Sequence, residues 1–159
     1  ALLPDKLQPL RPFDLKTRDG LVLPSFYLLP KGAKPGDRLP AVVLVHDDPS
    51  DRLGPNGYGA TLRTAQLLAS RGYAVVLPTL RGTLGFGNRV YYAGFGAMGR
   101  QAIDDVADAA AWAAKEGIAD PARLCVAGTG FGGYAAMMAA ARAPHSFRCA
   151  AVSAPVADL

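Results

Sequence analysis

The sequence predicts an α/β fold in which a mostly parallel sheet carries helices on both faces and an antiparallel hairpin opens the chain. Short apolar runs of strand length alternate with segments whose apolar residues recur at helical spacing, as they do in βαβ units. The first two extended segments, 13–18 and 21–29, flank Asp19-Gly20, which is a strong turn signal. At 159 residues the chain is expected to form a single domain over 1–159.

The first half of the chain supplies the hairpin, two buried strands and one helix. A connection rich in Gly, Lys and Pro leads to the β-branched run 41–46, which predicts a strand buried on both faces. The segment 58–70 has apolar residues at helical spacing, and Gly72 follows its end. Residues 73–79 are the next expected strand.

The second half continues the alternation. A glycine-rich loop over 80–99 precedes an expected helix over 100–117. Its apolar stripe comprises Ile103, Val106, Ala110 and Ala113. The aspartates at 104, 105 and 108 fall in its early turns, where the helix dipole favours negative charge.

The last three elements are a strand over 124–127, a helix over 132–143 and a strand over 147–154. We expect four runs to be parallel neighbours in one sheet. These runs are 41–45, 73–77, 124–127 and 148–152.

Composition excludes several classes of protein. Half of the residues are hydrophobic and 19% are charged, which is typical of a globular chain and not of a disordered one. The longest apolar runs are strand-sized and fall short of the ~20 residues that span a bilayer, so no membrane partner is expected. The net charge of +4 comes from scattered Lys and Arg, so no nucleic-acid partner is expected either. The sequence leaves the compartment open.

Cys125 and Cys149 each lie inside an apolar run of an expected strand. We interpret them as free buried thiols that act as small hydrophobic residues, close to each other but not bonded. Neither cysteine has the spacing of a metal ligand, and no other group of residues does, so no metal is expected.

Residues 124–134 read LCVAGTGFGGY, a short strand that enters a glycine-rich turn and then a helix. The spacing fits the nucleophile elbow G-x-S-x-G, with Gly128 and Gly132 as the outer glycines and Gly133 after them. The central position, however, is Gly130, where the motif requires a serine. Glycine supplies no nucleophile.

Several spaced motifs occur in the order in which one enzyme family carries them, and the chain resembles the catalytic domain of the prolyl oligopeptidase family of serine peptidases. The resemblance is to the branch that holds the dipeptidyl and acylaminoacyl peptidases. The motifs are Thr17-Arg-Asp-Gly20, His46-x-x-Pro49, Arg81-Gly-Thr-Leu-Gly-Phe-Gly87, Asp105-Val-x-Asp108, Trp112, Asp120-Pro-x-Arg123, Gly133-Tyr134 and Ala154-Pro-Val-x-Asp158.

The resemblance implies an α/β-hydrolase fold and hydrolysis of peptide or acyl-peptide bonds through a serine, with peptide substrates and no metal or organic cofactor. By the same resemblance, we expect residues 1–159 to be a fragment of this domain, the N-terminal part of a peptidase catalytic domain truncated after its sixth strand. It also implies a propeller domain ahead of Ala1. By resemblance, the backbone N–H of Phe131 points into the oxyanion hole, and the loop after the third strand forms its other side. In this fold the triad acid and base follow later strands, and Leu159 comes shortly after the sixth, so we expect both to be absent.

The chain departs from the family pattern in the oxyanion loop as well as at the elbow. Where the family has His-Gly-Gly-Pro, this chain has His46-Asp47-Asp48-Pro49. Carboxylates at Asp47 and Asp48 would repel a developing oxyanion if they faced the pocket. We therefore predict an inactive domain. Either it is naturally degenerate and kept for structure or binding, or it is an altered copy of an active enzyme, and the two changed loops favour degeneration.

Other candidate roles for this part of the chain are less favoured. Gly128, Gly130 and Gly133 also satisfy the dinucleotide fingerprint G-x-G-x-x-G, but the acidic residue expected about 20 positions later, at the end of the next strand, is missing. Thr129 lies beside the nucleophile position, where a packing role is favoured. The two histidines, His46 in the oxyanion loop and His145 in a surface loop, are not expected to act as the base.

Overall fold

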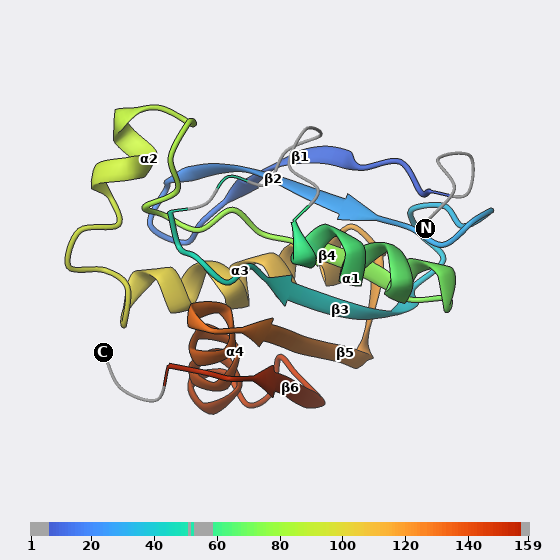
Figure 1. The fold of residues 1–159 in the computed structure, drawn as a ribbon. Helices are drawn as coiled ribbons and strands as arrows, with labels where there is room; N and C mark the ends of the chain where they lie inside the picture. The colour runs from blue at the N-terminus through green and yellow to red at the C-terminus, as the bar shows by residue number, and fades with distance from the viewer. Residues whose placement is uncertain (1–6, 51, 53–58, 157–159) are drawn as a thin grey trace.

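The computed structural model describes residues 7–50, 52 and 59–156 (Figure 1). In this part of the chain, one sheet has the strand order β1-β2-β4-β3-β5-β6. Antiparallel pairing joins β1 to β2 and β2 to β4, and parallel pairing joins β4, β3, β5 and β6. The strands are β1 (Arg11–Lys16), β2 (Val22–Leu28), β3 (Leu39–Val45), β4 (Ala74–Leu77), β5 (Ala119–Thr129) and β6 (Cys149–Ser153). The expected hairpin and the four parallel neighbours are confirmed.

Helices cover both faces of this sheet (Figure 1). They are α1 (Ala60–Ser70), α2 (Asn88–Tyr92), α3 (Gln101–Lys115) and α4 (Phe131–Arg142). The short helix α2 lies where the sequence predicts only loop, because five residues are too few to show an apolar stripe. Positions 58, 158 and 159 of the predicted segments lie outside the described residues. Among the described residues, no helix is both long and apolar enough to cross a bilayer.

The two sides of β3 face different cores. Val43 and Val45 pack in the cluster that includes α3 and α4, whereas Val42 and Leu44 pack with the buried side chains of α1. Because side chains alternate along a strand, burial on both faces requires an unbroken apolar run. The predicted stripe of α3 is confirmed, since Ile103, Val106, Ala110 and Ala113 are all buried.

The aspartates of α3 are paired with arginines, which the dipole argument alone did not predict. The fully buried carboxylate of Asp105 accepts hydrogen bonds from Arg81 Nε (2.9 Å) and Nη2 (2.7 Å). Arg81 also donates to both oxygens of Asp19 in the turn of the hairpin, at 2.8 and 3.1 Å. Asp108 accepts from Arg18 in the same turn, at 2.7 Å. These pairs hold the hairpin turn against α3 and the loop after β4.

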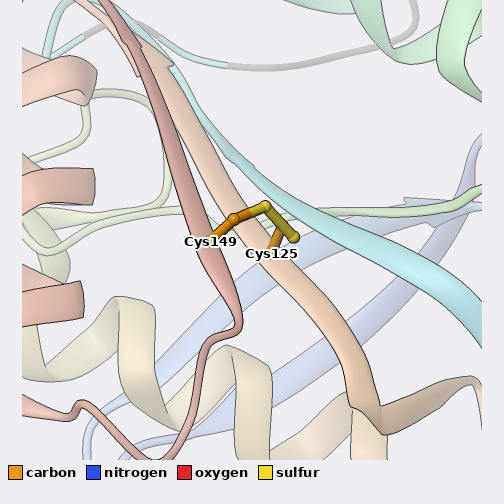
Figure 2. The surroundings of a disulfide bond; sticks show 2 residues. All are labelled: Cys125 and Cys149. Carbon is orange, nitrogen blue, oxygen red and sulfur yellow. A yellow bond between two sulfur atoms is a disulfide. The ribbon is translucent and has the colours of Figure 1, made fainter.

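Cys125 and Cys149 form a disulfide, so the prediction of free thiols is wrong (Figure 2). They are direct partners in the parallel ladder between β5 and β6, with Cα atoms 4.8 Å apart. Cys149 is also exposed, because β6 forms the edge of the sheet in the described part. Sequence spacing placed the two cysteines on adjacent strands, but only the strand register shows that they lie opposite each other.

Substitution of Asp19 should change how stability depends on pH. Hydrogen bonds from Arg81 and then Thr17 hold the pKa of Asp19 well below its ordinary value of 3.8. A carboxyl group with a lowered folded-state pKa stabilises the fold above its ordinary pKa and loses that contribution as the pH falls. We expect Asp19→Asn to lower the free energy of unfolding at pH 7, by at most about 1 kcal/mol because the carboxylate is half exposed, and the difference to narrow between pH 4 and pH 2.

Urea unfolding of both proteins at pH 7, 4 and 2.5 measures this difference. Asp14→Asn removes an exposed carboxylate from the neighbouring strand β1 and controls for the change in net charge. A difference between the wild type and Asp19→Asn that stays constant over this range would show that ionisation of Asp19 does not stabilise the fold.

Candidate functional site

The predicted elbow lies where β5 passes into α4. Gly130 joins them with φ 55° and ψ −123°, backbone angles that residues with a Cβ rarely adopt. Its N–H donates to the carbonyl of Ser153 (3.2 Å), and its carbonyl accepts from the N–H of Tyr134 (3.1 Å) and Val156 (3.2 Å). The turn is therefore held from both sides, by α4 and by the chain at the end of β6.

The other glycines of the motif allow α4 to approach the sheet closely. A Cβ on Gly128 would overlap the carbonyl of Gly132. A Cβ on Gly132 would lie 2.5 Å from the carbonyl oxygens of Val45 and His46. Side chains at these positions would force the start of α4 away from the ends of β3 and β5.

Asp47 lies directly against Gly130. Val45 is the partner of Gly128 in the parallel ladder of β3 and β5, so two residues further along each chain Asp47 comes opposite Gly130. A Cβ built on Gly130 would overlap Oδ1 of Asp47 and lie 2.7 Å from its Cγ. The carboxylate thus occupies the space in which any side chain at position 130 would begin.

Asp48 has a different environment from Asp47. Its Oδ1 accepts hydrogen bonds from the N–H (2.8 Å) and the hydroxyl (2.7 Å) of Ser50, and these bonds lower the pKa of Asp48. Its carbonyl lies 2.5 Å from Nδ1 of the buried His46. Because a carbonyl can only accept, Nδ1 of His46 carries the proton. The contacts of Asp48 therefore lie within its own loop. Of the two aspartates, Asp47 is the one that lies against Gly130.

A groove with a volume of about 280 Å³ opens beside Asp47, at the carboxyl ends of β3, β5 and β6. Open α/β sheets bind ligands at this edge. Its walls combine hydroxyl groups, small apolar side chains and the carboxylate of Asp47. The lining residues include Thr61, Thr64, Ala127, Thr129, Val152 and Ser153.

The structure separates the remaining candidates. Phe131 is buried at the first position of α4, and Thr129 is exposed at the end of β5, so the packing role favoured for Thr129 is wrong. His145 is exposed beyond the far end of α4, a helix of 12 residues and so about 18 Å long. Within the described ranges, no three His, Cys, Asp or Glu side chains are grouped so that they could hold a metal ion.

Sequence reasoning missed the contact between Asp47 and Gly130, although the signal was present. The runs that end at Val45 and Gly128 were both predicted as strands of one parallel sheet. Residues at equal distances beyond a paired position lie side by side, so counting two residues onward from that pair would have found the contact.

Comparison with known proteins agrees with this architecture. A sequence profile described as the prolyl oligopeptidase family matches residues 60–159. The chain belongs to the prolyl oligopeptidase family. Dipeptidyl aminopeptidase BIII of Pseudoxanthomonas mexicana is 35% identical over 151 residues, which cover 90% of this chain and 21% of that protein. Dipeptidyl peptidase family member 6 of Caenorhabditis elegans is 34% identical over 157 residues, which cover 86% of this chain and 21% of that protein.

Solved structures of peptidases also superpose on the chain. A puromycin-hydrolyzing peptidase of Mycobacterium tuberculosis matches all of it with a TM-score of 0.86 and 28% identity, over 25% of that protein. Dipeptidyl peptidase 4 of Porphyromonas gingivalis matches 96% of it with a TM-score of 0.81 and 26% identity, over 21% of that protein. The chain has the α/β architecture of these hydrolases and spans about a fifth of the length of the curated relatives that it matches.

A methyl group at position 130 should destabilise the fold. Gly130→Ala places a Cβ at a positive φ and forces the Asp47 carboxylate to move. We expect a loss of about 1–3 kcal/mol in the free energy of unfolding. Urea unfolding measures it.

Gly32→Ala is the matched control, since Gly32 has φ +82° and nothing within 4 Å of an added Cβ. It reports the cost of the backbone angle alone. Asp47→Ala should recover part of the loss at position 130, with a coupling of about 0.5 kcal/mol or more. Strictly additive effects would show that Asp47 does not obstruct position 130.

Proposed function

We propose that this chain is a member of the prolyl oligopeptidase family whose site does not perform acyl transfer to serine. The observation that carries the proposal is the contact of Asp47 with Gly130. Covalent catalysis in the family needs a serine side chain at the elbow, a base that accepts its proton and a group that orients the base. Here position 130 has no side chain, and the space for one is occupied.

Charge opposes the same chemistry. The N–H of Phe131, at the start of α4, is the proposed donor to an oxyanion formed during acyl transfer. Such donors help only when they face the developing negative charge without competition. The carboxylate of Asp47 brings a negative charge to this place before any substrate arrives, and it would repel the oxyanion.

The two departures from the family pattern fit each other, which supports natural degeneration over a single replacement in an active enzyme. An aspartate at position 47 is compatible with glycine at position 130 and overlaps a Cβ there. Replacing one serine in an active enzyme would leave the oxyanion loop unchanged. The family's peptide substrates make a peptide the proposed ligand, and the groove beside Asp47, with one carboxylate among hydroxyl and apolar groups, suits a peptide amine.

Dinucleotide binding is the weaker alternative. A pyrophosphate would have to lie at the N-terminus of α4, where the fingerprint glycines allow a close approach. Asp47 already places a carboxylate against Gly130 at this point, so the two anions would repel each other. The propeller domain stays a prediction of the family resemblance.

Restoring the serine alone should not restore chemistry. We compare wild type, Gly130→Ser, and Gly130→Ser combined with Asp47→Gly and Asp48→Gly, using release of p-nitrophenol from p-nitrophenyl acetate and labelling by a fluorophosphonate. We expect no acylation burst and no labelling in the wild type, which has no serine at position 130. We expect none in the single variant either, because the serine would lie against the Asp47 carboxylate, whose negative charge opposes the oxyanion. Any reactivity should be confined to the triple variant.

Circular dichroism of each variant establishes that it is folded, and added NAD tests the alternative. A burst or labelling in the wild type or in Gly130→Ser would contradict the proposal. A saturable rise of the wild-type Tm with NAD, absent from Gly130→Glu, would favour dinucleotide binding instead.

A further inference from the structure

The loop that follows β3 and carries Asp47 receives two hydrogen bonds from the chain after β4. The hydroxyl of Thr83 donates to the carbonyl of Pro49 (3.2 Å), and the N–H of Leu84 donates to the carbonyl of Ser50 (3.0 Å). Pro49 follows Asp47 by two residues. Because β3 holds the start of this loop, the two bonds fix the chain just beyond Asp47.

The turn that carries Thr83 is itself anchored in the interior of the protein. The N–H of Thr83 donates to the carbonyl of Leu80 (3.2 Å), which closes the turn. The N–H of Arg81 donates to the carboxylate of Asp105 on α3 (3.2 Å), and the guanidinium of Arg81 binds the same carboxylate. Thr83 therefore has little freedom to follow the loop after β3 if that loop moves.

Burial makes the hydroxyl of Thr83 a specific contact. Thr83 is 1% exposed, and its neighbours Arg81 and Asp105 are 5% and 0% exposed. A buried hydroxyl has to find its hydrogen-bond acceptor inside the protein, and for Thr83 this acceptor is the carbonyl of Pro49. The contact therefore favours one position of Pro49, and with it one position of Asp47.

We propose that Thr83 is a positioning residue that holds Asp47 against the elbow. The ladder of β3 and β5 ends at Val45 and Gly128 and determines that Asp47 is the residue opposite Gly130. Beyond this last ladder pair, the hydrogen bond from Thr83 determines how firmly the loop keeps the carboxylate there. The inference rests on the contact between Asp47 and Gly130 that also carries the proposed function.

The cost of a methyl group at position 130 measures how firmly Asp47 is held, because Gly130→Ala forces the carboxylate to move. Thr83→Val keeps the shape of the side chain and removes the hydroxyl. We expect the factor by which Gly130→Ala raises the unfolding equilibrium constant to be at least about twofold smaller in Thr83→Val than in the wild type. Urea unfolding of the two single variants, the double variant and the wild type measures this factor.

Two control variants separate positioning from a general loss of stability. Thr83→Ser retains the hydroxyl and should leave the factor for Gly130→Ala at its wild-type value. Thr79→Val removes another buried hydroxyl that donates to a proline carbonyl, that of Pro24 in β2. Thr79→Val should lower the Tm, as Thr83→Val does, but should not change the factor for Gly130→Ala.

A third background connects the effect to Asp47. When Asp47→Ala is present, Thr83→Val should no longer alter the cost of Gly130→Ala, because the obstructing carboxylate is gone. None of these measurements involves acylation. An acylation burst in Gly130→Ser would therefore overturn the proposed function and leave this result unaffected.

The amide NMR signal of Asp47 provides a second measurement. It should shift in Thr83→Val and stay in place in Thr83→Ser and Thr79→Val. An unchanged signal would overturn the inference, as would an unchanged factor for Gly130→Ala in Thr83→Val or an equal reduction of that factor in Thr79→Val.

Circular dichroism establishes that each variant is folded. If Thr83→Val is unfolded, Thr83→Ala removes the same hydroxyl and takes its place in both measurements. If neither variant folds, Thr83 supports the fold as a whole and the inference fails.

Discussion

Val45 lies opposite Gly128 in the parallel ladder of β3 and β5, and this register determines which residue faces the elbow. The two cores fix the register. A slip of one residue would move Val43 and Val45 out of the core formed with α3 and α4 and onto the opposite face of the sheet. Once the strands are fixed, the chain beyond β3 has no freedom to place another residue opposite Gly130. The position of Asp47 is thus a consequence of how the core packs.

The position of the Asp47 carboxylate is compatible with the structure of the turn. Gly130 is the N-cap of α4, and the N-terminus of a helix favours a nearby negative charge through its dipole and its unpaired N–H groups. A glycine at the turn removes both the steric conflict with Asp47 and the strain of the positive φ. The same two residues are therefore compatible with each other at the turn, and glycine leaves position 130 without a hydroxyl group.

The sequence was sufficient to predict the hairpin, the six strands, the three longer helices and the four parallel neighbours, because each has a local apolar pattern that matches its burial in the two cores. Side-chain partners far apart in sequence could not be predicted in this way. Asp105 on α3 pairs with Arg81 in the loop after β4. The position of Asp105 in its helix predicts only a favourable interaction with the helix dipole. The bond between Cys125 and Cys149 depends on how β5 and β6 are aligned, and the spacing of 24 residues between the cysteines does not reveal that alignment.

The elbow lies between β3, whose last five residues are buried, and β6, whose five residues are exposed in the described structure. On one side, apolar side chains buried on both faces of the sheet hold β3 in place, and this packing does not depend on the hydrogen bonds at the turn. On the other side, β6 is attached within the described structure by its ladder with β5, by contacts with α4 and by the disulfide. Gly130 is tied to both sides of this turn. Its hydrogen bonds with Ser153 and Val156 connect it to the chain around the end of β6, and its contact with Asp47 connects it to the chain that follows β3.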